Sequence, residues 1–493
     1  MGRPVQRLLA IDLGAESGRA IVGSFDGERL ALELVSRFPN RPVRAGPRLY
    51  WDALGLLAES VEAIGKAKAG GPLASLAIDS WGVDFGLLDR TGALVGMPVS
   101  YRDSRTDGLV ELVDRLVPRA EMYAETGIQA LQVNTLYQLV ASRRDGEGAL
   151  AAARTLLFIP DLLTFWLSGE TLAETTVAST SGLLGARSTG WARALMERLG
   201  LPADIFPPLV QAGTIVGELR GDLSGAVPVR VVATASHDTA AAVAGTPLAG
   251  DGCAFISCGT WSLVGVERDA PILTARSGEL NFTNEAGVGG SVRYLRNVMG
   301  LWLVQGIRRS LAARSISRTY EELEAEATAA GPATCHVDPD DLAFLHPSDM
   351  VEAIRRHCRE RRREIPVEPG QLVRIALESL AVRYRWVIGR LEELTDQRIH
   401  TIHIVGGGSA NGLLCQLTAN ATGRLVLSGP VEAAAIGNLL VQLIATGALA
   451  DLPQARAMLA ATTSPRRYEP VAEPRWTAAE EALFGSRATG APS

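Results

Sequence analysis

Short apolar runs bounded by turn-forming or polar residues recur along this chain, and the pattern predicts a series of β-strands. Most runs are four to nine residues long, which is too short for a core helix and typical of buried strands. Several end directly at an Asp or a Gly, so chemically useful residues are expected where strands stop. The expected strands are residues 8–12, 20–24, 30–38, 73–79, 85–88, 229–233 and 400–405.

Other stretches carry the helical period instead. Apolar residues recur every three or four positions over residues 371–394, which predicts one long helix. Residues 432–446 are Ala-rich and almost free of charge, so we expect a helix buried between neighbours. Further helices are expected at 52–67 and 412–421, and residues 107–199 are expected to be largely helical. Strands mixed with helices in both halves favour an α/β class with a mixed sheet in each half.

One strand pair occurs twice, half a chain apart. Residues 8–23 read LLAIDLGAESGRAIVG and residues 253–267 read CAFISCGTWSLVGVE, with Gly14 and Gly259 at equivalent places. Each copy is an apolar strand, a turn with Gly and hydroxyl or acidic residues, and a second apolar strand. Glycine lets backbone N–H groups approach a phosphate closely. Two such turns indicate a duplicated fold that holds one polyphosphate from both sides of a cleft, as an ATP-dependent phosphotransferase would.

The length of 493 residues predicts two domains. A turn-rich stretch, TPLAGDG at 246–252, is the expected crossing between them. We therefore expect an N-terminal domain over 1–245, which holds the first phosphate turn. A second domain is expected over 246–450, followed by a C-terminal tail over 451–493 that frays at its end.

Composition removes several function classes. Hydrophobic residues make up 47% of the chain and charged residues 21%, with a net charge of −6, so no basic surface for nucleic acid or anionic membrane is expected. No apolar run reaches the ~18 residues of a membrane helix, and the first one meets Asp12 too early for a leader. Five cysteines without CxxC spacing favour a reducing cytoplasm and argue against a zinc site.

Two segments carry acids at strand ends. Asp12, in the first turn, could hold Mg²⁺ through water beside phosphate oxygens. The alternative is an ordinary hairpin turn with a solvated Asp12. The second copy, at 257–262, favours the phosphate interpretation. Asp238, in SHDT after the strand at 229–233, suits a general base for phosphoryl transfer to an alcohol. The alternative for Asp238 is an N-cap of the Ala-rich helix that follows.

Three weaker candidates complete the set. Glycines 406–408 follow a strand and would let a ring or ribose lie on the backbone, or would form a plain tight turn. The DSWGVDF segment at 79–85 suits a sugar platform, or a β-turn with Trp81 in the core. Asn297 and Gln305 lie eight residues apart, which would place both on one face of a single helix, in reach of sugar and nucleotide.

Taken together, these segments resemble the FGGY carbohydrate kinases of the actin-like, hexokinase-like ATPase superfamily, most closely the branch acting on L-rhamnulose. The resemblance covers about residues 8–450, and many matches in one order are more specific than any single match. The segments that carry it are AIDLGAESGR (10–19), IDSWGVDFGLLD (78–89), YRDSRTDG (101–108), ASHDTAAAV (235–243), SCGTWSLVGVE (257–267), NFTNE (281–285), RNVMGLWLVQ (296–305), IHIVGGGSANGLLCQL (402–417) and GPVEAAAIGN (429–438).

The resemblance implies two RNase H-like domains, each a mixed β-sheet flanked by helices, with the active site in the interdomain cleft. The domain over 1–245 would bind the sugar and carry the catalytic acid, and the domain over 246–450 would bind the nucleotide. It implies a cytoplasmic enzyme that uses ATP with Mg²⁺ to phosphorylate the 1-hydroxyl of L-rhamnulose in L-rhamnose catabolism. The products would be ADP and L-rhamnulose 1-phosphate. Members of the family are monomers or homodimers, and the expected partners are small molecules only, with neither nucleic acid nor membrane.

The resemblance also assigns roles to residues. Asp238 matches the proton acceptor, and Asp12 matches the acid facing hydrated Mg²⁺. The residues matching sugar contacts are Gly82, His237, Asp238, Thr239 and Asn297. The residues matching nucleotide contacts are Ala15, Glu16, Ser17, Gly18, Arg19, Thr260, Gln305 and Gly407.

Glu16 departs from the pattern, since many relatives carry a small hydroxyl residue there. A carboxylate beside a triphosphate is repelled unless it points away or helps hold the metal. Two other functions stay open: a kinase for another ketose such as L-fuculose or L-ribulose, and a non-catalytic sugar- and ATP-binding protein. The presence of both phosphate turns, Asp12 and Asp238 argues against the second.

Overall fold

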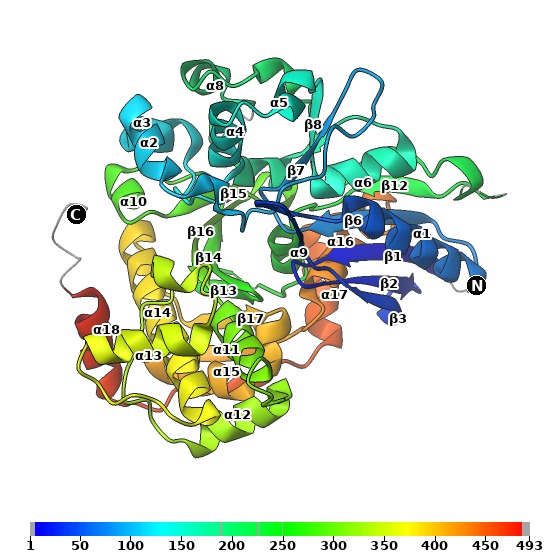
Figure 1. The fold of residues 1–493 in the computed structure, drawn as a ribbon. Helices are drawn as coiled ribbons and strands as arrows, with labels where there is room; N and C mark the ends of the chain where they lie inside the picture. Colours follow the sequence, from blue (N-terminus) through cyan, green and yellow to red (C-terminus); the bar gives the residue numbers. More distant parts are fainter. Residues whose placement is uncertain (1–4, 188–189, 224, 226, 249, 486–493) are drawn as a thin grey trace. The chain divides into compact units, whose positions relative to one another are not determined.

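The computed structural model describes residues 5–187, 190–223, 225, 227–248 and 250–485, and these form two compact units, coloured along the chain in Figure 1. Neither unit is continuous in sequence. The first comprises Met1–Pro247, Glu267–Tyr294 and Ala433–Ser464, and the second comprises Leu248–Val266, Leu295–Glu432 and Pro465–Ser493. The fraying expected at the end of the chain falls on residues 486–493, outside the described residues.

The first unit is built on a six-stranded mixed sheet with the order β11-β12-β6-β1-β2-β3. Strands β1, β2 and β3 form an antiparallel meander, whereas β1, β6 and β12 run parallel. The central strands are buried on both faces, so they read as continuous apolar runs. The strand bounds are β1 Gln6–Leu13, β2 Ser17–Phe25, β3 Leu30–Pro39, β6 Ser75–Ser80, β11 Thr214–Glu218 and β12 Arg230–Ala233.

Helix α16 (Ala433–Ala445) belongs to this first unit although it lies near the end of the chain. Its apolar side chains pack against β1 and β2 together with those of α17 (Leu452–Thr462). Two fully buried amides fix its register on the sheet. Gln442 Nε2 donates to the carbonyl of Leu9 at 3.0 Å, and Asn438 Nδ2 donates to Asp79 Oδ2 at 2.6 Å. The buried, nearly charge-free helix expected from the sequence is confirmed.

The segment expected to be largely helical is helical in most parts but also contains strands. Strand β8 (Thr155–Phe158) pairs antiparallel with β7 (Phe85–Leu88), and β9 (Ala173–Glu174) pairs with β10 (Leu209–Val210). These pairings join residues far apart in the chain, which local periodicity does not reveal. The helices here are α2 Leu109–Leu116, α3 Arg119–Thr126, α4 Thr135–Arg144, α5 Gly148–Ala152, α6 Ile159–Ser168, α7 Thr175–Ala178 and α8 Arg193–Arg198.

The second unit also contains a mixed sheet. The antiparallel pair β13 (Cys253–Cys258) and β14 (Trp261–Arg268) repeats the β1–β2 hairpin, and β13, β17 (Thr401–Val405) and β18 (Leu425–Ser428) run parallel. The short strand β19 (Arg466–Tyr468) completes this edge. The long helix expected from the sequence is present as α14 (Pro369–Thr395). The expected fold class, mixed sheets flanked by helices in two units, is confirmed.

The remaining elements connect and cover these sheets. In the first unit they are β4 Val43–Ala45, β5 Arg48–Tyr50, β15 Thr283–Ala286, α1 Ala53–Ala69, α9 Asp238–Ala244 and α10 Ala275–Glu279. In the second they are α11 Trp302–Ala312, α12 Tyr320–Ala329, α13 Met350–Glu360, α15 Gly412–Thr422 and α18 Arg475–Phe484, while β16 (Val292–Met299) crosses the boundary. Within the described part of the chain, no helix combines the length and apolarity that crossing a membrane requires.

Candidate active site

Three carboxylates lie at the ends of three neighbouring parallel strands in the first unit. Asp12 on β1 and Asp79 on β6 are paired directly across the two strands. Asp238 is the first residue of α9, just after β12, and its loop returns to β6 because Ser80 N donates to the carbonyl of Ser236 at 2.9 Å. Strands running in the same direction end at the same edge of a sheet, so the three acids gather there. We call Asp12, Asp79 and Asp238 the carboxylate cluster.

The carboxylate cluster carries more negative charge than its neighbours neutralise. Arg19 Nε pairs with Asp12 Oδ2 at 2.9 Å, and Asn438 donates to Asp79 Oδ2. Asp79 is fully buried, and its Oδ1 has no hydrogen-bond partner among the described residues. Burial raises the pKa of Asp79 well above its usual value, and the charges of Asp12 and Asp238 raise it further.

Asp238 is the accessible member of the cluster. Its side chain keeps 31% of its exposure, whereas that of Asp12 keeps 3%. Desolvation, followed by the charge of Asp12, raises the pKa of Asp238 to about 7, although Thr239 lowers it by donating to Oδ1 at 3.2 Å. A reachable carboxylate with this pKa is suited to accepting a proton near neutral pH.

His237, beside Asp238, is buried and held on both sides of its ring. Nδ1 lies 3.1 Å from Arg293 Nη2 and 3.5 Å from Glu285 Oε2, and Nε2 lies 3.5 Å from Asp238 Oδ1. Desolvation, and then the charge of Arg293, lowers the pKa of His237 well below its usual value. The imidazole is therefore neutral at neutral pH.

Glu174 anchors the loop that carries His237 and Asp238, and the sequence reasoning missed it. Its carboxylate accepts from Ser236 N at 3.0 Å and Thr176 N at 2.9 Å, and Thr176 Oγ1 accepts from His237 N at 3.1 Å. Burial raises the pKa of Glu174. Glu174 caps α7 in the structure, but glutamate is not among the residues that mark a helix start in sequence, and nothing links it to a loop 62 residues away.

The first phosphate-turn candidate is a tight connection between β1 and β2. Gly14 N donates to the carbonyl of Ser17 at 3.0 Å, and Asn40 Nδ2 donates to the carbonyl of Gly14 at 2.8 Å. Glu16 is exposed, with its carbonyl accepting from Asn40 N. A Cβ on Gly18 would lie 2.2 Å from the ring of Phe38, so glycine is needed there for packing. The turn thus leaves Ala15 and Glu16 at its tip.

The WGVD turn at 81–84 is held under strain. Val83 is β-branched yet has φ of 66°, a left-handed conformation that such residues rarely adopt. Its N–H donates to Thr180 Oγ1 at 3.0 Å, and its carbonyl accepts from Thr135 Oγ1 at 2.7 Å. A Cβ on Gly82 would lie 2.8 Å from Thr180 Oγ1, so this side of Gly82 is closed by protein.

Trp81 is a core residue, which favours the second interpretation of this segment. It is 5% exposed, and its indole N–H donates to Asp84 Oδ2 at 2.9 Å, as does that of Trp51 at 2.5 Å. Gln138 Nε2 donates to Asp84 Oδ1 at 2.8 Å. Burial nevertheless raises the pKa of Asp84 to about 6. The acid therefore ties the turn to the core.

In the second unit, the structure brings Thr260 and Gln305 together. Thr260 lies in the turn between β13 and β14, and Gln305 Nε2 lies 3.4 Å from its Oγ1. The backbone of Gly300 also donates to the carbonyl of Thr260 at 3.1 Å. Gln305 is on α11, whereas Asn297 is on strand β16. The expectation that Asn297 and Gln305 share one helical face is therefore wrong, because the chain leaves the strand and turns at Gly300 between them.

The three glycines after β17 serve different purposes. Gly406 has φ of 76°, which favours glycine, and a Cβ on Gly408 would lie 2.2 Å from Cys258 Sγ. A Cβ on Gly407 would have no other atom within 4 Å, so this residue borders open space. Of the three, Gly407 is the one whose surroundings leave room for a ligand.

The expected site residues thus fall into two sets, each described within its own unit. The first unit holds Asp12, Ala15, Glu16, Ser17, Gly18, Arg19, Gly82, His237, Asp238 and Thr239. The second holds Thr260, Asn297, Gln305 and Gly407. Both sets contain residues expected to bind nucleotide, as a duplicated phosphate turn requires.

Comparison with known proteins defines the class. The family described as "FGGY family of carbohydrate kinases, N-terminal domain" matches residues 7–245, and its C-terminal counterpart matches residues 254–446. This chain therefore belongs to the FGGY family of carbohydrate kinases, enzymes that phosphorylate sugars, and the resemblance noted in the sequence is confirmed.

Individual relatives narrow the comparison. The chain is 41% identical over 480 residues to the rhamnulokinase of Bacteroides thetaiotaomicron, covering 96% of this chain and 98% of the relative. It is 39% identical over 458 residues to that of Enterococcus faecalis, covering 91% of each. Among solved structures, a ligand-bound xylulose kinase from Lactobacillus acidophilus matches with a TM-score of 0.78 at 14% identity, over 98% of this chain and 96% of that one, which shows the shared fold.

Proposed function

We propose that this chain transfers the γ-phosphoryl group of ATP to the 1-hydroxyl of L-rhamnulose, giving L-rhamnulose 1-phosphate and ADP in L-rhamnose catabolism. Relatives named rhamnulokinase, matched over nearly their whole length, support the substrate. The observation that supports the chemistry is the partly exposed carboxylate of Asp238, which has a pKa of about 7. It lies beside two further acids, Asp12 and Asp79. The proposed setting is the cytoplasm, with small molecules as the partners.

Asp238 is the proposed general base. As the sugar O1 attacks the γ-phosphorus, a new O–P bond forms and the bond to the bridging oxygen of ADP breaks. The hydroxyl proton passes to Asp238, whose ionised form must be free to accept it. Gly82, His237, Thr239 and Asn297 are the proposed sugar contacts. His237 is neutral, so it presents the site with a hydrogen-bonding group without adding charge.

The nucleotide is proposed to contact both duplicated turns. Residues 15–19 follow Asp12 in the first turn, and Thr260 with Gln305 forms the second. Gly407 borders open space, which suits a flat ring or a ribose lying on its backbone. The exposed position of Glu16 at the tip of its turn is compatible with a side chain pointing away from the phosphates.

The proposed metal is Mg²⁺, bound with the nucleotide, and the residues present fit it through water. Asp79 Oδ1 is a buried oxygen without a hydrogen-bond partner among the described residues, and Asp12 lies beside it at the strand ends. Over those same residues, no group of three or more His, Cys, Asp or Glu is arranged to hold a metal ion. Asp12 would therefore face the hydrated cation, which when bound supplies charge neutralisation for the phosphates.

The test is ADP release, coupled to a spectroscopic readout, with Mg-ATP and a panel of L-rhamnulose, L-fuculose, L-ribulose, D-xylulose and glycerol. We expect kcat/KM to be highest for L-rhamnulose, and EDTA to abolish turnover until Mg²⁺ is restored. A preference for L-fuculose or L-ribulose would keep the mechanism but replace the substrate. No turnover with any sugar, while ATP still binds, would overturn the catalytic assignment in favour of a non-catalytic binding protein.

A further inference from the structure

A buried arginine that the mechanism above does not use lies behind His237. Arg293, on β16, is 0% exposed and is held from several directions. Its Nε donates to the carbonyl of Ala286 at 3.0 Å, and its Nη1 pairs with Glu285 Oε2 at 3.2 Å. Its Nη2 lies 3.1 Å from Nδ1 of His237. The guanidinium therefore has little freedom to turn away from the imidazole.

The chemistry of this contact settles which imidazole nitrogen carries the proton. A guanidinium offers only N–H donors and does not lose its proton in proteins. The nitrogen that faces it at hydrogen-bond distance must therefore accept. A neutral imidazole that accepts at Nδ1 carries its single proton on Nε2. Nε2 is the nitrogen that lies 3.5 Å from Asp238 Oδ1.

We propose that Arg293 is a positioning residue for the phosphoryl-transfer step, holding neutral His237 in the Nε2–H tautomer so that an N–H bond faces Asp238. This inference rests on the proposed function only for its effect on catalysis; the tautomer itself does not depend on the substrate. No local pattern indicates this contact, because Arg293 and His237 lie 56 residues apart in the chain.

Glu285 is the competing group, since its Oε2 lies 3.5 Å from the same Nδ1 and would accept from an Nδ1–H. Two observations favour Arg293. Its contact with Nδ1 is a hydrogen bond of 3.1 Å, whereas the 3.5 Å contact of Glu285 Oε2 is not one, and that Oε2 forms an ion pair with Arg293 Nη1. The acid thus orients the guanidinium, which in turn sets the ring.

The consequence concerns Asp238. An Nε2–H that faces the carboxylate favours its ionised form and limits its rotation, whereas the other tautomer would turn a lone pair toward Oδ1 and repel it. At 3.5 Å the two groups are not hydrogen-bonded in this structure. The N–H is therefore available to Asp238 or to an oxygen of a bound ligand.

The experiment reads the tautomer directly by two-bond ¹H–¹⁵N correlation on the full-length protein labelled with ¹⁵N-histidine. The chain has six histidines, and His237→Gln assigns the relevant signals by their loss. We expect the wild-type His237 to show a protonated Nε2 and an unprotonated Nδ1. Arg293→Met, which removes the donors while keeping an apolar stem, should shift His237 to a mixture of tautomers or to Nδ1–H. Protonation of Nδ1 in the wild type, or an unchanged tautomer in Arg293→Met, would overturn the proposal.

Kinetics and a matched control separate positioning from general damage. Arg293→Met should lower kcat about 10- to 100-fold, by analogy with the loss of the hydrogen-bond partner that orients a metal-binding histidine, with little change in the KM for ATP. Arg293→Lys keeps a charged donor and should restore both the tautomer and most of kcat. Arg374→Met removes another buried arginine, one paired with Glu378 in the second unit, and should leave the His237 signals and kcat unchanged.

The two proposals fail separately. If the sugar panel gives another ketose, kcat is measured on that sugar and the tautomer result stands. If no sugar is turned over, the tautomer is still measured in the protein without substrate. In that case the proposed function is contradicted and the tautomer proposal is not. If Arg293→Met does not fold, the wild-type tautomer and Arg293→Lys decide the question, and a wild-type Nδ1–H still overturns it.

Discussion

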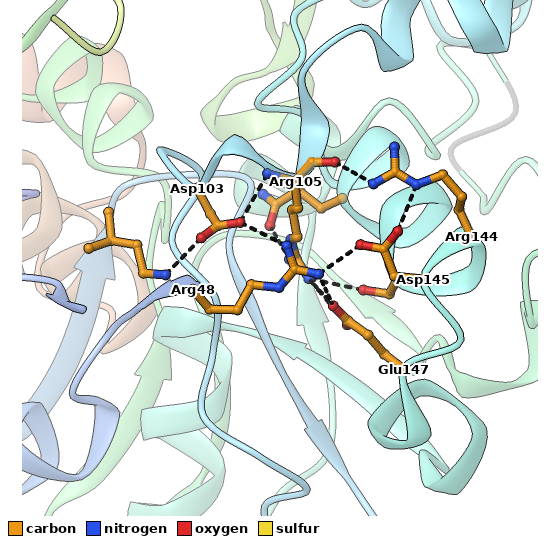
Figure 2. Close-up of polar contacts among 9 residues, drawn as sticks. Arg48, Asp103, Arg105, Arg144, Asp145 and Glu147 are labelled. Carbon is orange, nitrogen blue, oxygen red and sulfur yellow. Dashed lines mark hydrogen bonds and ion pairs between the residues drawn. The ribbon is translucent and has the colours of Figure 1, made fainter. Parts of the chain in front are cut away.

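Two clusters of ionisable groups in the first unit are built in opposite ways. One, which we call the arginine–acid cluster, contains three arginines and three acids in mutual contact, as Figure 2 shows; its members are Arg48, Asp103, Arg105, Arg144, Asp145 and Glu147. The other is the carboxylate cluster. Among the residues that the structure describes, no arginine or lysine forms an ion pair with Asp79 or Asp238.

The pKa shifts reflect this difference in charge balance. In the arginine–acid cluster, a hydrogen bond from Arg144, followed by one from Arg48, lowers the pKa of Asp145. In the carboxylate cluster, burial and neighbouring acids raise the pKa values of Asp79 and Asp238. Balanced charges stabilise the fold, whereas unbalanced acids cost stability and keep a group able to take up a proton. The contrast distinguishes a structural cluster from the proposed catalytic one without reference to any relative.

The largest expected effect comes from removing the proposed base, Asp238. Asp238→Asn keeps the shape of the side chain but cannot accept the sugar proton, so kcat should fall about 10²- to 10⁴-fold. The KM for the sugar and the affinity for ATP should change little. Steady-state kinetics with the best sugar of the panel, and ATP titration by calorimetry, check both. Turnover within a few-fold of the wild type would contradict the assignment of Asp238.

The wild-type pH profile tests the same group independently. A base must be ionised to act, so kcat/KM should rise with pH and level off above the pKa of Asp238, which is about 7. The residual kcat/KM of the Asp238→Asn variant should not show this rise with pH.

The second effect is on stability. Arg105 is buried and donates to Ser142 Oγ and Gln138 Oε1, both at 3.0 Å, while its Nη1 pairs with Glu147 Oε2 at 3.3 Å. Arg105→Met removes these contacts, although Glu147 Oε1 keeps its pairing with Arg48 Nη2 at 3.4 Å. Removing one partner of a buried pair costs about 3–5 kcal/mol, and because Glu147 is 24% exposed we expect about 2–3 kcal/mol. Urea unfolding measures it.

The control for this variant is an exposed pair. Lys66 and Glu62 form an ion pair on α1 with half or more of each side chain exposed. Lys66→Ala should change the free energy of unfolding by at most about 0.5 kcal/mol. Equal losses for Arg105→Met and Lys66→Ala would show that burial does not distinguish the arginine–acid cluster, and a fall in kcat for Arg105→Met as large as that of Asp238→Asn would erase the contrast between the clusters.

Local patterns were enough to predict most elements and the two duplicated hairpins. Apolar runs that end in Asp12 or Asp79 mark strand ends, and parallel strands bring such ends together, so the carboxylate cluster follows from short-range signals. The buried helix α16 was also predictable from its composition. Its membership of the first unit was not, because the amides of Asn438 and Gln442 bond to strands more than 350 residues earlier.

The supporting residues were harder to predict for the same reason. Glu174 and Arg293 reach the SHDT loop from elements 62 and 56 residues away, and neither sits in a recognisable motif. Val83 lies in the segment expected to form a platform or a β-turn, but nothing in the sequence indicates the left-handed backbone in which two threonine hydroxyls hold it. Asn297 was misassigned to a helix because the strand β16 and helix α11 follow each other within a few residues. Tertiary contacts, rather than local preference, set all of these.

The smallest expected effect is a pH dependence of stability. The pKa of Asp238 is raised from 3.8 to about 7, so between these values the folded protein binds more protons at this site than the unfolded chain. The stability contributed by the protonated group is complete below pH 3.8 and is lost as pH rises through about 7. Asp238→Asn has no such loss. Its stability relative to the wild type should therefore increase by about 1–2 kcal/mol from pH 5 to pH 8, after allowance for solvent screening, as urea unfolding at each pH would measure.

Asp145→Asn, in the arginine–acid cluster, is the matched control, because the pKa of Asp145 is shifted in the opposite direction. The lowered pKa of Asp145 gives stability that is present above pH 3.8 and lost only as pH falls through the still lower folded value. Asp145→Asn should therefore destabilise the protein by the same amount at pH 5 and pH 8, while Asp238→Asn gives a difference that grows with pH. If both variants show the same pH dependence, charge balance does not separate the two clusters, and the reason for regarding Asp238 as a poised base is lost.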